Sequence, residues 1–322
     1  MSNENSDKIA ARLSQTLLKV VWRQWRTLGV NISDVHRDAQ TAVDPEALLL
    51  TTTVLLDQEP RLRDVLASWL TGRSTSLSIQ RLRNMAKLFP PSATSLLPTL
   101  AAVALKQGKD HRWRPLLGPA GTPTDLGDRK KDLLGARTYR PTGAIMVQTR
   151  LGMGVGVKAD VMAYLLCVSR SGQDWASISA IQEALGYTTA AIGRAVEEMS
   201  AANFISAPGS VDRHNRPPKM YRAEAAGWGK VLGLGSGMPA WGSWDQHFRF
   251  ATKFLAWNVA AAGRNVTDYA LATNLRSLSE EHPRALGTGR SDEEQPPSDI
   301  AEYPEFIERR LVDWENWVES NG

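Results

Sequence analysis

The chain of 322 residues contains one cysteine, Cys167, and only five histidines. A single cysteine cannot form an internal disulfide, so we expect a reducing compartment, the cytoplasm. We interpret Cys167 as a small buried apolar residue and not as a reactive thiol. The histidines lie far apart in the sequence, and none stands at metal-ligand spacing from a cysteine or an acid. From this scarcity we expect neither a bound metal nor a cofactor.

The sequence also lacks long apolar runs and the short motifs of several enzyme classes. No stretch is apolar enough to span a bilayer, and no signal peptide is recognised before the first predicted helix. Neither a GxSxG nucleophile elbow nor an HExxH zinc motif occurs. The glycine-rich segment at 152–156 resembles a phosphate loop only superficially, because the GxxxxGK(S/T) pattern is missing. We therefore expect a protein that is not an enzyme and does not enter a membrane.

Hydrophobic residues make up 42% of the chain and charged residues 22%, which is ordinary for a globular protein. The net charge of +4 permits a polyanionic partner without requiring one. Length and patterning predict a mainly α-helical protein of several domains. The predicted parts are an N-terminal helical domain at 1–117, a linker at 118–141, a central domain at 142–232, and a C-terminal helical domain at 233–322.

The central domain has the clearest local pattern. Apolar residues at helical spacing predict a first helix over 158–169. A second helix is predicted to begin at the N-cap Ser177 and to end at Gly186. The remaining elements follow in order: a tight turn at Tyr187, a third helix capped by Thr188 or Thr189 and ending near Ala202, a strand at 204–206, a polar loop at 208–218 and a strand near 219–222. This is the order of a winged helix-turn-helix with a small β wing.

In that arrangement the N-terminal end of the third helix enters the major groove of duplex DNA. Small residues there allow the backbone to approach phosphate, and hydroxyl and free N–H groups can bond it. Arg194 can read a guanine edge or hold a phosphate. The loop is basic and fits the DNA backbone or the minor groove. The predicted DNA-binding residues are Thr188, Thr189, Ala190, Gly193, Arg194, Arg213, His214, Asn215, Arg216 and Lys219.

Other residues favour a different interpretation of the same surface. Glu197 and Glu198 oppose extensive contact with DNA, although they lie a turn further from the end that enters the groove. Winged helices also serve as protein-binding modules, and a charged loop is often only solvated. The alternative function is an antitoxin-like or adaptor module that neutralises a protein partner, such as a toxin-like enzyme.

Predicted helices of the N-terminal domain carry basic outer faces. In the helix predicted over 77–88, the pattern places Arg81, Arg83 and Lys87 towards solvent. Such faces can add phosphate contacts. We favour the plainer interpretation, in which the cations keep the outer side of a helix hydrated. Trp113 stands between arginines and can stack on a base, but a packing anchor is its commoner role.

The C-terminal domain is rich in aromatic residues. Those of the helix predicted over 245–262 are expected to form core, with a ligand pocket between helices as the alternative. The last predicted helix, 303–318, has a stripe of large side chains. Because helix-turn-helix proteins commonly read two half-sites as dimers, we expect a homodimer with this stripe as its seam. The stripe consists of Phe306, Arg310, Trp314 and Trp317.

The central unit resembles that of MarR- and ArsR-like bacterial transcription regulators. Further segments resemble predicted winged-helix regulators that are often encoded beside abortive-infection-type nucleotidyltransferases. These segments are DPEALLL at 44–50, PRLRDVLASWL at 60–70, LSIQRLRNM at 77–85 and VKADVMAYLL at 157–166. The resemblance implies a groove helix at 188–202, a wing at 208–218, and a repressor or antitoxin-like autoregulator tied to phage defence.

These patterns together predict a cytoplasmic transcriptional regulator that binds double-stranded DNA in a sequence-specific manner. We expect it to act as a homodimer and to repress by occupying a promoter. No membrane and no small-molecule cofactor enter this prediction.

Overall fold

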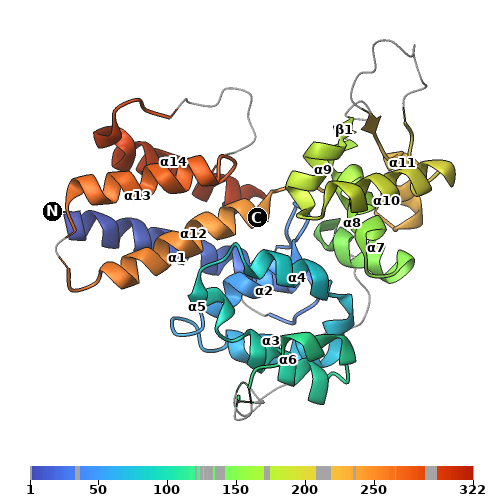
Figure 1. Ribbon diagram of the computed structural model, residues 1–322, viewed down its shortest axis with the longest axis horizontal. Coiled ribbons are helices and arrows are strands. Elements are labelled where there is room, and N and C mark those ends of the chain that lie inside the picture. Colours follow the sequence, from blue (N-terminus) through green and yellow to red (C-terminus); the bar gives the residue numbers. More distant parts are fainter. Residues whose placement is uncertain are drawn as a thin grey trace.

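The structure is a computed structural model, and it describes residues 2–32, 37–119, 122–123, 126, 133–134, 142–169, 175–207, 219–234, 237–264, 266–286 and 296–321. Over these residues the chain is mainly helical, as predicted, with the helices labelled α1 to α14 and one two-stranded sheet (Figure 1). None of the described helices is both long and apolar enough to cross a membrane.

The N-terminal part is a set of helices around one central helix. That helix, α2 (Pro45–Val54), is capped by Asp44, whose carboxylate accepts from the Ala47 amide over 3.0 Å. Nearly all of its residues are buried, as expected of a helix that is apolar on most sides. Of the other elements, α1 (Ser2–Thr27), α4 (Ile79–Ala86) and α5 (Pro91–Thr94) pack against α2. A neighbouring group consists of α3 (Leu62–Arg73), η1 (Ser74–Ser76), α6 (Leu97–Lys106) and η2 (His111–Leu116).

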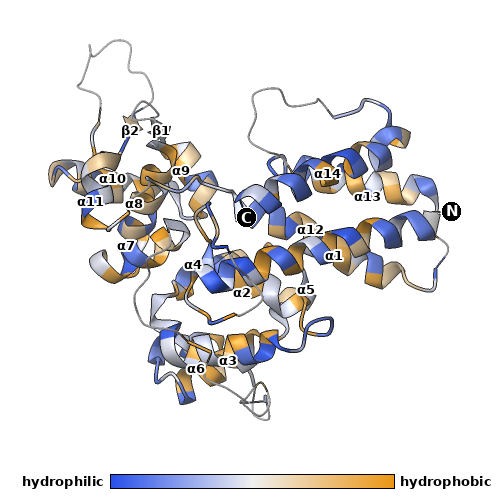
Figure 2. Cartoon of the chain, turned by 180° about the vertical axis from the view of Figure 1, so that it is seen from behind, coloured by the Kyte–Doolittle hydropathy of each residue, from blue (hydrophilic) through white to orange (hydrophobic). Residues whose placement is uncertain are grey.

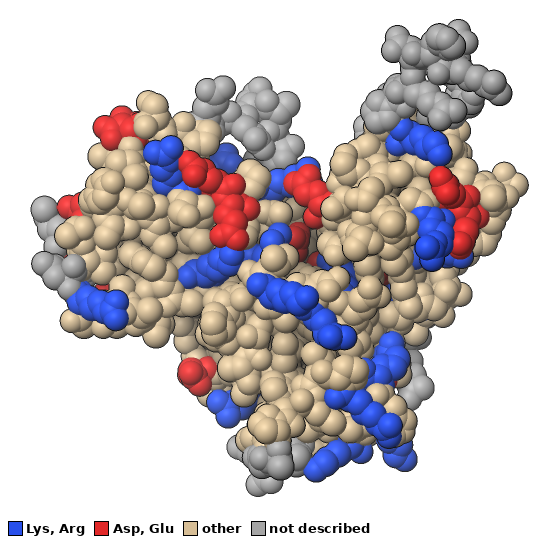
Figure 3. All heavy atoms as spheres, in the orientation of Figure 1, with Lys and Arg blue, Asp and Glu red and all other residues tan. Residues whose placement is uncertain are grey.

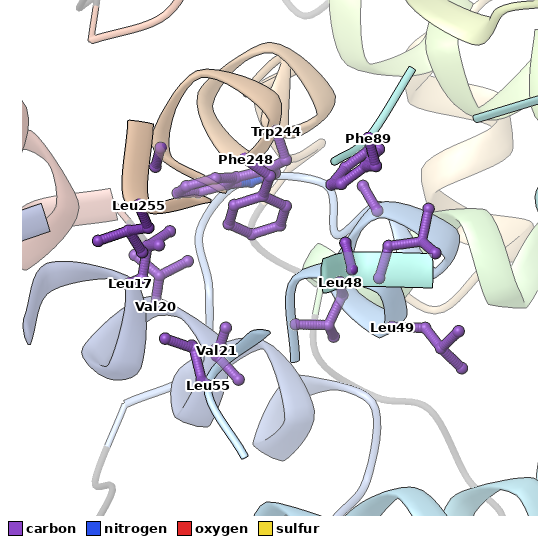
Figure 4. Close-up of a cluster of buried hydrophobic side chains, with 14 of the residues drawn as sticks. Leu17, Val20, Val21, Leu48, Leu49, Leu55, Phe89, Trp244, Phe248 and Leu255 are labelled. Carbon is purple, nitrogen blue, oxygen red and sulfur yellow. The ribbon is translucent and has the colours of Figure 1, made fainter. Parts of the chain in front are cut away.

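The C-terminal helices join this same part of the molecule. They are α12 (Trp244–Ala261), α13 (Asp268–Glu281), η5 (Ile300–Glu302) and α14 (Tyr303–Asn321). Helix α12 packs against α1 and α2, and α14 packs against α1 and α13. Figure 4 shows Val21 of α1, Leu48 of α2 and Phe248 of α12 in one buried cluster. The predicted N-terminal and C-terminal helical domains therefore share a single hydrophobic core.

The aromatic side chains of the predicted stripe on α14 pack in or against this core, and Arg310 and Trp317 are partly exposed. Phe306 is 6% exposed and Trp314 is fully buried. The ring of His247, on α12, stacks between Trp314 and Trp317, with ring centroids 5.7 and 5.6 Å away. The expectation that this stripe forms a dimer seam is wrong, because the chain's own helices already cover it.

A second core holds the central part of the chain. Its elements are α7 (Ile145–Met153), α8 (Val157–Val168), β1 (Ala176–Ser177), α9 (Ile178–Leu185), α10 (Thr189–Ala201), β2 (Met220–Tyr221) and α11 (Ala225–Val231). The short η3 (Thr142–Ala144) precedes them and places Ala144 in the first core. The buried side chains of the second core are Ala42 and residues between Ile145 and Met238, and they include Cys167, which is 2% exposed as expected. Figure 2 shows hydrophilic and hydrophobic residues sharing many of the helices, which is the amphipathic pattern used for the sequence predictions.

Candidate nucleic-acid interface

Helices α9 and α10, joined by a tight turn, form the candidate interface. Helix α9 begins at Ser177, whose hydroxyl accepts from the Ala180 amide over 3.2 Å. It ends at Gly186, whose φ of 71° lies in the left-handed region that favours glycine. Thr188 then caps α10 by accepting from the Ala191 amide over 3.3 Å. These caps confirm the local predictions made from the sequence.

The inner faces of both helices belong to the second core. Ile181 and Leu185 of α9 and Ile192 and Val196 of α10 are fully buried. Helix α10 packs against α8 as well as α9. This packing fixes which side of α10 faces outward, because a helix with a buried apolar stripe presents its other side to solvent.

The structure brings five of the predicted contact residues onto the outer side of α10. Thr188, Thr189, Ala190 and Arg194 are exposed, and Gly193 is partly exposed. A Cβ built at Gly193 would meet nothing within 4 Å, so packing inside the chain does not require glycine there. Glycine leaves the backbone of this turn without a side chain to cover it.

The charges on this side of α10 are mixed. Lys158 lies 2.5 Å from Glu198, and Lys219 lies 3.4 Å from Glu197. Arg194 has no hydrogen bond or salt bridge with a described residue. The predicted contact residue Lys219 is therefore shared with an acid. The pKa of Glu198 is lowered first by its hydrogen bond to Lys158, and the charge of Arg194 contributes to the same effect. The Arg194 guanidinium nevertheless has all its hydrogen-bond donors unused by described residues.

Backbone pairing joins the two ends of the predicted polar loop. The amide of Ser206 donates to the Arg222 carbonyl over 2.8 Å, and the reverse bond is 3.1 Å long. Strand β2 also pairs in antiparallel fashion with β1, a two-residue strand too short to give a pattern in the sequence. The guanidinium of Arg222 lies over the Trp175 ring at 4.6 Å, a contact the sequence did not reveal. The predicted loop residues Arg213, His214, Asn215 and Arg216 lie outside the described residues.

Behind the turn lies a buried network of charged side chains. Arg81 of α4 donates to both carboxylate oxygens of Asp44, over 2.6 and 2.5 Å, and to Glu46 over 2.7 Å. The expectation that Arg81 faces solvent is wrong, since its side chain is 1% exposed. Helical spacing placed Arg81 away from the apolar stripe of α4. That side is nevertheless buried, because it meets carboxylates from α2.

A second arginine extends the network to the central part of the chain. Arg150 of α7 donates to Glu46 over 2.7 and 3.0 Å, and to Asp160 of α8 over 2.6 and 2.8 Å. It also reaches the Ser76 carbonyl over 3.0 Å. The Arg150, Glu46 and Asp160 side chains are completely buried. The network thus has two guanidinium groups and three carboxylates, and it joins the two hydrophobic cores.

Two contacts connect this network to the turn before α10. The Arg81 Nε donates to the Leu185 carbonyl over 3.0 Å, at the end of α9. The Tyr187 hydroxyl donates to Asp160 Oδ2 over 2.8 Å, and its oxygen lies 3.3 Å from the Ser78 hydroxyl. The network therefore positions the turn that precedes the exposed helix.

The ionised forms of the network stabilise one another. Burial raises the pKa of Asp44, but Arg81 outweighs this effect through its charge and hydrogen bonds, so the pKa lies below its ordinary value. Burial lowers the pKa of Arg81 and Arg150, but the neighbouring carboxylates raise both above the ordinary arginine value. The pKa of Tyr187 is raised, first by burial and then by the Asp160 charge. Tyr187 therefore keeps its proton as a hydrogen-bond donor.

Sequence reasoning missed Glu46, Arg150 and Asp160. Each stands on a helix that is otherwise mostly apolar on the same side: Glu46 precedes ALLL, Arg150 follows IMV by three residues, and Asp160 precedes VMAYLL. Because an unpaired buried charge is very costly, a single charge inside an apolar helix signals a buried partner elsewhere. The sequence contains that signal but does not say which charges meet.

Comparisons with protein-family models, with curated proteins and with solved structures find no match to this chain. Among the described residues, no group of three or more histidines, cysteines and acids could hold a metal ion. Trp113, considered as a base-stacking residue, is fully buried and packs in the first core.

Proposed function

We propose that the chain is a sequence-specific double-stranded DNA-binding regulator of transcription, in which α8, α9, α10 and the small sheet act as a winged helix-turn-helix. The observation that carries the proposal is the exposed N-terminal end of α10. It combines a capped start at Thr188, an open glycine surface at Gly193 and an exposed Arg194 that has no hydrogen bond or salt bridge with a described residue. The Thr189 hydroxyl already donates to Gln182 over 2.6 Å, so this end supplies the Thr188 hydroxyl, free amides and one cation to a DNA groove.

Two further features support this proposal. The turn before α10 is held by buried hydrogen bonds, so the helix is presented in a fixed orientation. The pairing of Ser206 with Arg222 closes the base of a loop whose sequence is basic. A rigid helix beside a basic loop is the combination that groove docking requires.

The test uses purified protein and duplex DNA taken from upstream of its own gene, with a scrambled duplex as competitor, over a series of salt concentrations. We expect selective binding that weakens steeply with salt, because neutralised phosphates release counterions. Arg194→Ala should lower affinity for the upstream DNA by roughly 5- to 150-fold, the equivalent of one good base contact. Equal, weak binding to both duplexes would argue against a sequence-specific regulator.

A protein-binding function is the second candidate, and the acids near the interface favour it. Glu183, Glu197 and Glu198 are exposed and lie within ion pairs with nearby cations, which lowers the positive potential of this side. An antitoxin-like or adaptor module would bind a protein partner through the same surface. Co-purification of a partner that survives nuclease treatment, with no DNA selectivity, would support this candidate instead.

The proposed regulator binds as a homodimer and acts as a repressor, by occupying a promoter. Dimerisation requires a surface other than the stripe on α14, because that stripe is covered within the chain. Sedimentation at micromolar protein measures the oligomeric state, and a monomer alone and on DNA would remove the dimer from the proposal.

A further inference from the structure

A long stretch of the N-terminal part is almost free of acids. Between residues 65 and 119 the sequence has eight lysines and arginines but one acid, Asp110. That acid is itself buried, and it bonds Arg112 over 2.7 and 2.9 Å. Since the whole chain carries only +4, the remaining residues are net negative. Positive charge is therefore concentrated in this stretch.

Five of these cations are exposed and have no hydrogen bond or salt bridge with a described residue. They define what we call the basic patch: Arg83, Lys87, Lys106, Lys109 and Arg114. Their elements are adjacent, because η2 packs against both α6 and α4. In Figure 3 blue side chains lie over α4 and around the end of α6 with no red among them, whereas blue and red are mixed beside α10.

The basic face of α1 shows what a merely solvated surface looks like in this molecule. Lys8, Arg12 and Lys19 each pair with a glutamate of α14, over 3.5, 2.9 and 3.2 Å. The cations on that face are thus neutralised within the chain. Those of the basic patch have no acidic partner among the described residues. Like charges that lie close together repel one another, so the patch fits an external polyanion.

Helix α4 connects the basic patch to the candidate interface. Its buried side carries Arg81, which bonds the end of α9 at the Leu185 carbonyl. Its exposed side carries Arg83, and the exposed Lys87 follows as its C-cap. Arg112 of η2 donates to the carbonyls of Ser74 and Leu77, both over 3.2 Å, and so ties η2 to the start of α4. The patch and the turn before α10 are therefore held in one rigid arrangement.

We propose that the basic patch binds the phosphate backbone of double-stranded DNA and adds affinity that does not depend on sequence. This inference rests on the proposed function for its DNA partner, but it concerns a different surface. Point charges on lysines and arginines bind phosphates without reading bases. The patch then supplies general affinity, while α10 supplies selectivity.

The test compares three forms of the full chain: wild type, a patch variant with Lys106→Gln, Lys109→Gln and Arg114→Gln, and a control variant. The control carries Lys8→Gln, Lys19→Gln and Lys253→Gln, which remove three lysines that are paired with acids. Both variants lower the net charge equally. Circular dichroism and thermal melting confirm that each is folded, and binding to upstream and random duplexes is measured over a salt series.

The patch variant should bind both duplexes more weakly, with the slope of log affinity against log salt shallower by roughly 2 to 3. Its preference for upstream DNA should be unchanged, and the control variant should behave as wild type. A patch variant that binds like wild type, or a control variant that weakens equally, would overturn the patch while leaving the regulator intact. Wild type could instead bind both duplexes equally while only the patch variant shows a shallower salt dependence. That result would support phosphate binding by the basic patch and contradict the sequence-specific function. Absence of any DNA binding by wild type removes both.

Discussion

The Tyr187 hydroxyl donates a hydrogen bond to Asp160 over 2.8 Å, and both side chains are buried. This contact ties the turn before α10 to α8. Because a hydrogen bond to a charged group is worth about 1.5–3 kcal/mol, Tyr187→Phe should lower the free energy of unfolding by about that amount. Urea denaturation measures the change. Tyr164→Phe is the matched control, since the Tyr164 side chain is also buried but its hydroxyl makes no hydrogen bond with a described residue. Equal losses in the two variants would contradict this assignment.

Arg150 neutralises two buried carboxylates at once, so its removal should be severe. Arg150→Met leaves Glu46 and Asp160 short of a partner, and we expect a loss of about 3–5 kcal/mol in the free energy of unfolding. Arg12→Met breaks the partly exposed pair with Glu315 and should cost no more than about 1 kcal/mol. Chemical denaturation of both variants gives the comparison. A loss at Arg150 as small as that at Arg12 would show that the network contributes little to stability.

We expect Gly193 to favour DNA binding while lowering the free energy of unfolding relative to alanine. Gly193→Ala introduces a Cβ that meets nothing, and it should raise stability by about 0.5–1 kcal/mol through helix propensity. Under the proposed function the same methyl group lies where DNA approaches, so affinity should fall several-fold. Gly152→Ala on α7, where a Cβ also meets nothing, is the control and should leave DNA affinity unchanged. Unaltered affinity in Gly193→Ala would argue against close approach of DNA to this turn.

His247 makes stability depend on pH. Burial is the main cause that lowers its pKa from 6.5 to about 3, outweighing a hydrogen bond to the Gly242 backbone that raises it. Its Nδ1 accepts from the Leu286 amide over 3.0 Å. The folded protein keeps the ring neutral while the unfolded chain takes up a proton below its ordinary pKa. The stabilisation is therefore complete above pH 6.5 and is lost as the pH falls from 6.5 towards 3, by about 1.4 kcal/mol per pH unit.

The contribution of His247 is isolated by difference, because neighbouring groups also titrate. Burial lowers the pKa of His282 to about 4, which acts in the same sense. Burial raises the pKa of Asp245 to about 6, which acts in the opposite sense between pH 6 and 3.8. Urea midpoints of wild type and His247→Gln between pH 7.5 and 5 should show a flatter pH dependence in the variant. Parallel curves for the two proteins would rule out a neutral buried His247 as the cause.

Local features of this protein are readable from the sequence. The caps at Asp44, Ser177 and Thr188 and the stop at Gly186 depend on one side chain or one backbone conformation each. Apolar stripes likewise located most of the helices and the outer side of α10. These features act within a turn or two of chain, so their signals lie close together in the sequence.

Features that require distant segments to meet were decided only by the tertiary structure. Arg81 has the spacing of a solvent-facing residue, yet carboxylates some 35 residues earlier in the chain bury it. The stripe on α14 has the pattern of an interface between subunits, but its contacts are with other helices of the same chain. The pairing of α1 cations with α14 acids, which distinguishes a neutralised face from the basic patch, joins opposite ends of the sequence. The periodicity of a sequence indicates whether a helix face is polar or apolar. Which segment contacts that face depends on how the whole chain packs.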